Sequence, residues 1–222
     1  MAVSPVIEFV KYISIVCIGL LPIMNPLSTI PLYIALTKRM SKERKRKQVH
    51  NTCIYAFSIL TLFLILGQGI ISVFNISLPG IRIAGGIIIM ILALRMIFSG
   101  EDTSSEVNVE PSEIKNAQTD YSFSPLAMPS LAGPGSIAVV MSFSSQIPVE
   151  HPIIGHIIVI LAILIAVVVT YMALSSACFI ERILGEHGMH AVNRIMGFLL
   201  TCSAVQFLAS GIHDFYIEFA KA

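Results

Sequence analysis

Two short segments combine proline with small or polar residues that could bind a solute. They are Asn25-Pro26-Leu27-Ser28 and, 108 residues later, Gly133-Pro134-Gly135-Ser136, and each interrupts a long apolar run. Proline removes a backbone donor and clashes with the preceding turn, so neither run can remain one continuous helix. Inside hydrocarbon an unpaired backbone group costs several kcal/mol, so such breaks persist only beside protein or a wet cavity. Two matched breaks therefore predict a binding site inside a membrane protein, whereas a single proline would indicate only a packing kink.

The chemistry of these breaks suits a small neutral or zwitterionic solute. Freed N–H groups at the start of a half-helix attract a carboxylate, and freed carbonyls attract an ammonium group or a cation. No Asp or Glu falls near the middle of a predicted span, which disfavours cationic substrates and a carboxylate proton relay. The predicted substrate-binding residues are Asn25, Pro26, Ser28, Gly133, Pro134, Gly135 and Ser136.

Two arginines occupy matching positions in the two halves of the chain. Arg82 opens the segment Arg82-Ile83-Ala84-Gly85, and Arg194 opens Arg194-Ile195-Met196-Gly197, 112 residues later. Snorkelling of a long cationic side chain to the membrane surface would explain each one. Their matching positions also predict a second role, in which they cap the broken helices or close gates from opposite sides.

The elements that must position these residues are membrane-spanning helices. The composition is 55% hydrophobic and 12% charged, whereas a soluble domain has about 25% charged residues. The mean hydropathy is +0.84. A helical span needs about 20 mostly apolar residues. Six spans are predicted, with the first and fourth broken, at about 7–37, 49–73, 81–98, 124–147, 152–179 and 192–215. The expected fold class is an all-α integral membrane protein.

The matched motifs indicate an internal repeat of three spans. Because three is odd, the second repeat must enter the membrane upside down relative to the first, as in many secondary transporters. We expect one membrane domain over residues 1–222. It would comprise a first repeat (1–98), an acidic cytoplasmic linker (99–122) and an inverted second repeat (123–222).

The distribution of basic residues predicts the orientation. Residues 38–47 hold seven of the fourteen Lys and Arg residues, which places this short loop in the cytoplasm and both termini in the periplasm. Carboxylates contribute little to orientation, so the acidic linker does not oppose this assignment. The net charge of +1 gives no overall field that would attract nucleic acid.

Other polar residues point to packing. The four cysteines lie singly in apolar runs, so no disulfide or metal site is expected. These cysteines are Cys17, Cys53, Cys178 and Cys202. Interhelical hydrogen bonds are expected for Gln68, His156 and Gln206. His213 and Asp214 are expected to be exposed at the interface. No HExxH, GxSxG or Walker pattern occurs, so neither an enzyme nor a cofactor is expected.

Four segments together resemble the MarC family (UPF0056), and the resemblance covers the whole chain. They are 25–26, 81–86, 125–138 and 194–200, of which 125–138 is the most specific. The resemblance implies a bacterial inner-membrane protein with six spans and both termini periplasmic. Members of the family have been grouped with small neutral amino acid transporters. The resemblance supplies no catalytic residues to carry over.

We therefore expect a secondary transporter, either a permease or an exporter, of small neutral or zwitterionic solutes, amino acids above all. One alternative is a channel lined by the same breaks. Another is a non-transporting scaffold or regulatory protein that binds a cytoplasmic partner through residues 38–47 and the linker. The expected partners are the lipid bilayer and a small solute, without nucleic acid, and a homo-oligomer is left open.

Overall fold

The computed structural model describes residues 5–98, 119–147 and 152–221, and within these ranges the regular elements are all helices. The first half contains α1 (Pro5–Met24), α2 (Pro26–Thr37), α3 (Lys42–Val73) and α4 (Leu78–Phe98). The second half contains η3 (Ser122–Leu131), α5 (Pro134–Ser145), α6 (Pro152–Ser175) and α7 (Ala177–Lys221). Most of the expected linker, residues 99–118, lies outside the described residues. The all-α fold class is confirmed.

The six expected spans are present when the bent helix pair is counted as one. Within the described ranges, five apolar stretches are long enough to cross a membrane, and η3 with α5 forms a further pair that is bent by 60°. The first of the five covers α1 and α2 together, from Phe9 to Thr37. Large side chains on the outside of the bundle are apolar: Ile18 is 73% exposed and Ile153 is 74% exposed. Such a surface suits contact with lipid.

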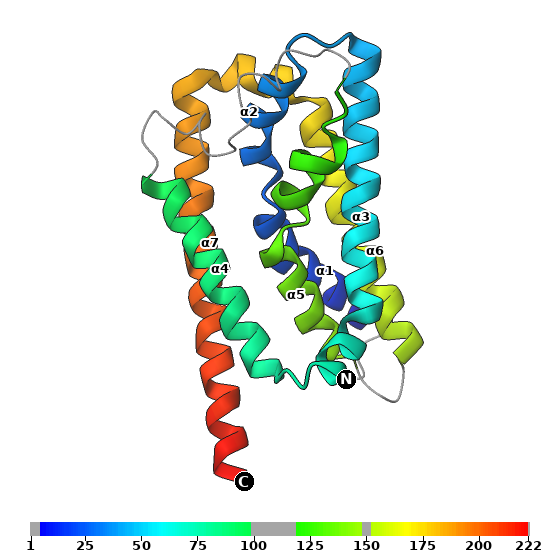
Figure 1. The fold of residues 1–222 in the computed structure, drawn as a ribbon, viewed down its shortest axis with the longest axis vertical. Helices are drawn as coiled ribbons and strands as arrows, with labels where there is room; N and C mark the ends of the chain where they lie inside the picture. Colours follow the sequence, from blue (N-terminus) through cyan, green and yellow to red (C-terminus); the bar gives the residue numbers. More distant parts are fainter. Residues whose placement is uncertain (1–4, 99–118, 148–151, 222) are drawn as a thin grey trace.

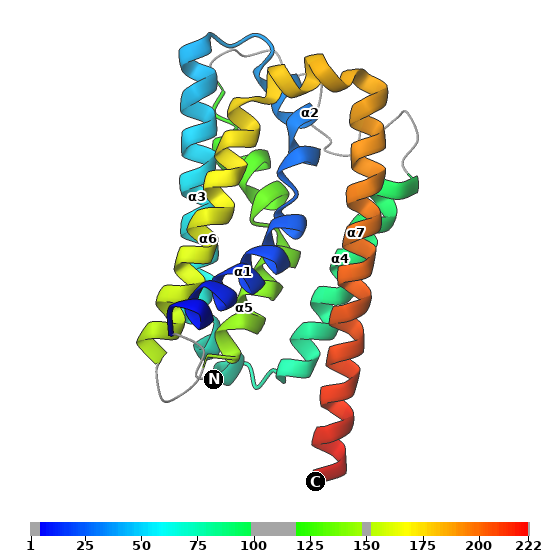
Figure 2. The same cartoon turned by 180° about the vertical axis from the view of Figure 1, so that it is seen from behind.

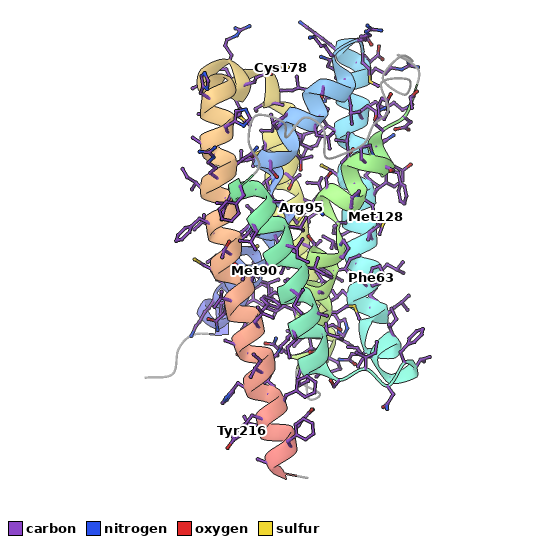
Figure 3. All side chains as sticks on the ribbon, turned by 60° about the vertical axis from the view of Figure 1, so that its left-hand side comes forward. Phe63, Met90, Arg95, Met128, Cys178 and Tyr216 are labelled. Carbon is purple, nitrogen blue, oxygen red and sulfur yellow. The ribbon has the colours of Figure 1, made fainter. Side chains whose placement is uncertain are left out.

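Two helix boundaries differ from the expectation. The helix α3 begins at Lys42 because Ser41 caps it, with its hydroxyl accepting the backbone N–H of Arg44 at 3.4 Å. Residues 181–190, which lie between the fifth and sixth expected spans, are helical and belong to α7. The chain turns there at Gly185, whose φ of 62° suits glycine. The end of α7, with Tyr216, extends past the neighbouring helices (Figure 3).

The two halves run in opposite directions through the bundle. Figures 1 and 2 show the start of α1 and the end of α7 at the same end of the molecule, with the α2–α3 connection at the other end. The packing is reciprocal: α4 lies along α7, α3 lies along α6, and the broken span of each half packs on the second span of the other half. This arrangement agrees with an inverted repeat.

Glycines bring α4 and α7 into close contact. A Cβ atom added at Gly86 would lie 3.1 Å from the backbone oxygen of Ala204, and one at Gly197 would lie 2.9 Å from the backbone oxygen of Ala93. At Gly211 the corresponding atom is the backbone oxygen of Pro79, at 3.0 Å. Small residues of this kind let helices approach closely in a membrane, where helix association depends on packing.

Because backbone lies against Gly197, we predict that Gly197→Ala lowers the stability of the folded protein. Overpacking of this kind costs about 1–3 kcal/mol. The control is Gly69→Ala on α3, where an added Cβ would meet nothing within 4 Å. Thermal unfolding in detergent should show a lower melting temperature for Gly197→Ala only. Equal melting temperatures for the two variants would contradict the close packing of α4 against α7.

Candidate functional site

The first break is a single residue between two helices. Asn25 adopts a left-handed conformation (φ 44°, ψ 63°), which asparagine tolerates better than most residues. Its backbone N–H donates to Leu21 O at 3.1 Å, and its side-chain Oδ1 accepts the backbone N–H of Ser28 at 3.4 Å. Pro26 then takes the first helical position of α2, where no N–H is needed. Asn25 thus ends α1 and caps α2.

The second break repeats this design with glycine. Gly133 precedes α5 and Pro134 takes its first position, as Pro26 does in α2. A Cβ atom added at Gly133 would lie 2.3 Å from Pro129 O, so a side chain does not fit. The prediction of a single break at 133–135 was incomplete. Non-helical backbone also occurs at Ser124 and Met128, each directly before a proline.

Hydroxyl groups bind the carbonyls that the breaks set free. Ser28 Oγ and Thr29 Oγ1 both donate to Asn25 O, at 3.1 and 3.3 Å, and Ser136 Oγ donates to Leu131 O at 2.9 Å. The sequence predicts the two serines as solute ligands, whereas here they stabilise the interrupted backbone. Sequence reasoning missed the hydrogen bond from Thr29 to Asn25 O, although a hydroxyl residue directly after Ser28 indicates such a bond.

The two breaks meet in the interior of the bundle. A Cβ atom at Gly135 would lie 3.3 Å from Ile23 Cγ2, at the end of α1, and 3.1 Å from Ile89 Cγ1 on α4. The helices α2 and α5 therefore begin near each other and extend toward opposite ends of the molecule (Figure 1). Each helix start carries a partial positive charge, so both suit a carboxylate.

The Asn25 side chain also points to α4. Its Nδ2 lies 3.1 Å from Met96 Sδ, and Asn25 is only 6% exposed. A thioether sulfur is a weak acceptor, so this buried amide donor lacks a strong partner. Sequence reasoning missed Met96 because a methionine within an apolar run resembles an ordinary packing residue. The helix α4 therefore contacts both breaks, through Met96 and Ile89.

Arg82 links three helices at the end of the bundle where the described chain begins and ends. Its Nη1 forms an ion pair with the Asp214 carboxylate on α7, and its Nε donates to Ser142 Oγ on α5 at 3.2 Å. The side chains of Arg82 and Asp214 are 19% and 33% exposed. His213 is exposed, as expected, whereas Asp214 is only partly exposed because α7 runs antiparallel along α4 and brings Asp214 to Arg82. Arg194, in contrast, is exposed in the first half of α7.

Further hydrogen bonds attach α5 to α3. Gln68 Nε2 donates to Ser144 O at 3.0 Å, and Ser144 Oγ donates to Leu64 O at 2.9 Å. The interhelical role expected for Gln68 is confirmed. The same expectation is wrong for Gln206, which bonds to Ser210 on its own helix, and for His156, which bonds to Pro152 O on α6.

A polar cluster fixes the start of η3 at the opposite end. Gln48 Oε1 accepts the backbone N–H of Tyr121 at 3.0 Å and lies 2.8 Å from Ser122 Oγ. The Ser122 hydroxyl also lies 2.5 Å from Asp120 Oδ1, so its one proton serves either acceptor. The hydrogen bond from this hydroxyl holds the pKa of the Asp120 carboxyl below its usual range. Sequence reasoning missed this cluster.

Two of the four cysteines pack against α6. Cys17 Sγ and Cys53 Sγ contact backbone oxygens of α6, at 3.4 Å from Ala162 O and 3.9 Å from Val167 O, which fits the expected packing role. Among the residues that the structure describes, no three His, Cys, Asp or Glu side chains gather closely enough to hold a metal ion.

Comparison with known proteins identifies the family. Residues 10–216 match the description "MarC family integral membrane protein". The chain belongs to the MarC family. The chain is similar to the protein called UPF0056 inner membrane protein MarC from Escherichia coli O1:K1. The two are 34% identical over 93% of this chain and 96% of the relative. The proteins of that name in Salmonella paratyphi A and Citrobacter koseri are 34% and 35% identical, each over 92% of this chain and 96% of the relative.

The family assignment agrees with the apolar helices, so the chain is a multi-pass protein of the inner membrane. The expected resemblance to MarC is confirmed over nearly the whole chain. No solved structure shows a significant match to the chain.

We predict that Arg82 and Asp214 stabilise the fold cooperatively. In a double-mutant cycle of Arg82→Gln and Asp214→Asn, the coupling energy should be about 1 kcal/mol, because partial exposure weakens the pair. A parallel cycle of the exposed Arg194→Gln with Asp214→Asn should give no coupling. Denaturant unfolding in detergent measures both cycles, and purely additive effects in the first would contradict the ion pair.

Proposed function

We propose that this MarC protein is a secondary transporter of small neutral or zwitterionic solutes, amino acids above all, across the inner membrane. The observation that supports this most directly is the approach of the two breaks, where Gly135 packs against Ile23. It brings the starts of α2 and α5 together at the middle of the molecule. Discontinuous helices that meet near the bilayer midplane are where such carriers bind their substrates.

The residues at the breaks suit the two ends of an amino acid. The starts of α2 and α5 would attract the carboxylate, and the Asn25 amide would donate to it in place of the weak contact with Met96 Sδ. Gly135 has no side chain, so a small solute would approach the backbone of α5 closely there once Ile23 and Ile89 move away from it. Leu131 O accepts the hydroxyl of Ser136, and its second lone pair would accept the ammonium group.

Alternating access would follow from the inverted arrangement. The helix α5 is attached to α3 and α4 through Ser144 and Ser142, whereas α2 ends at the opposite side of the molecule. Rocking of one broken span against the other would expose the central site to each side in turn. The basic run lies at the end opposite to α1's start and α7's end, so the positive-inside rule supports periplasmic termini.

Counterflow in proteoliposomes tests the proposal. Vesicles loaded with unlabelled alanine, glycine or serine receive the labelled solute outside, with or without a sodium or proton gradient. A carrier gives transient accumulation above equilibrium, and the gradient dependence identifies the coupling ion. The absence of accumulation with folded protein would contradict transport of these solutes, and rapid entry that does not saturate would favour a channel.

We further predict that Asn25→Gly abolishes this counterflow while the protein still inserts and remains monodisperse. Glycine accepts the left-handed conformation and is tolerated at a helix N-cap, so only the carboxamide is lost. The matched control is Asn75→Gly, because Asn75 also has a positive φ (50°) but lies in the exposed turn between α3 and α4. Unchanged counterflow by Asn25→Gly would remove Asn25 from the site.

A further inference from the structure

A cationic cavity lies at the connection between α2 and α3. Its volume is about 370 Å³, and its lining residues are Arg39, Met40, Ser41, Glu43, Arg44 and Lys47. Three positive charges thus face one carboxylate. The basic run of residues 38–47 is accounted for by membrane topology, but topology depends on the number of positive charges near a span. It does not require three of them to line one cavity.

Hydrogen bonds fix the turn that carries these side chains. The backbone N–H of Met40 donates to Thr37 O at 2.9 Å, and Tyr33 Oη donates to Lys45 O at 3.3 Å. Ser41 Oγ accepts the backbone N–H of Arg44, and Met40 is buried with 7% exposure. The cations are therefore attached to a well-supported framework. The attraction for an anion comes from their side chains, since Ser41 already serves the helix start.

The cavity also lies directly after the end of a candidate span. The first candidate span ends at Thr37, and the cavity begins two residues later at Arg39. This is the level at which lipid headgroups meet the end of a span. An anionic phospholipid brings a phosphate to the same level, and cationic side chains near such lipids contribute about 1 kcal/mol each to binding.

We propose that this cavity binds a phosphate group, with Arg39 and Arg44 as hydrogen-bonding cations and Lys47 as a third positive charge. A guanidinium fork matches the oxygens of a phosphate, and a lysine ammonium adds charge without a fixed geometry. The phosphate can belong to an anionic phospholipid or be inorganic phosphate, and a competition experiment distinguishes the two sources. This site is distinct from the proposed transport site and does not depend on it.

Two triple variants with equal charge test the proposal. One is Arg39→Ala/Arg44→Ala/Lys47→Ala, which removes the lining cations. The matched control is Lys38→Ala/Lys42→Ala/Arg46→Ala, which removes three exposed cations of the same run that do not line the cavity. Native mass spectrometry of the purified protein measures the binding of phosphatidylglycerol. The lining variant should bind it at least about tenfold more weakly. The control should retain most of the affinity, and equal losses would overturn the proposal.

Competition then identifies the source of the phosphate. Inorganic phosphate is added to the phosphatidylglycerol complex, with chloride at equal ionic strength as the reference. Selective displacement by phosphate supports a site for soluble phosphate, and retention of the lipid supports a phospholipid site. Phosphatidylcholine, which has no net charge, should bind more weakly than phosphatidylglycerol. Equal retention of the two lipids would overturn the proposal.

A second variant keeps the test decisive if the triple variant does not fold. Glu43→Gln removes the one acidic group that lines the cavity and leaves every cation in place. Binding of phosphatidylglycerol should tighten about fivefold, since one unfavourable charge near the phosphate is removed. Unchanged or weaker binding by Glu43→Gln would contradict an anion site.

Discussion

The constraint on which this structure depends is that a helix broken inside a membrane must bind its own freed backbone groups. At the first break Asn25 caps α2, and two hydroxyls, of Ser28 and Thr29, bind the Asn25 carbonyl. At the second break Ser136 binds Leu131 O, and the missing Cβ of Gly133 makes room for Pro129 O. These local solutions allow two interruptions to persist where lipid offers no hydrogen bonds. They also bring the starts of two half-helices to the interior, where their partial charges are least screened.

The helix α4 connects these breaks to the rest of the bundle. It contacts the second break through Ile89, the first through Met96, and α5 again through Arg82. Its other side lies against the glycines of α7, so the two third spans form one close-packed unit. A movement of either broken span would therefore exchange contacts with α4 while the pair of α4 and α7 stays together. In the alternating access that we propose, the pair of α4 and α7 would stay fixed while the broken spans move.

Much of the fold follows from the sequence, because hydropathy, proline and charge report directly on span length, breaks and orientation. The breaks at Asn25 and Gly133, the six spans and the use of Gln68 between helices could all be predicted. The contacts of Asp214, Met96 and Gln48 could not, since each depends on how helices that are distant in sequence align. The segment around Gly185 falls between two predicted spans because it is charged, yet it is helical. The roles of Ser28 and Ser136 as solute ligands stay a prediction.

The central claim is that the two breaks form one interior site that opens alternately to each side of the membrane. Its most direct test places a single cysteine at Ser28 or Ser136, in a protein whose native cysteines are replaced by alanine. A membrane-impermeant thiol reagent is then applied to right-side-out and inside-out vesicles. We predict that both positions react from both sides and that alanine slows the reaction. Positions that never react, or that react at a rate unaffected by any small neutral amino acid, would contradict it.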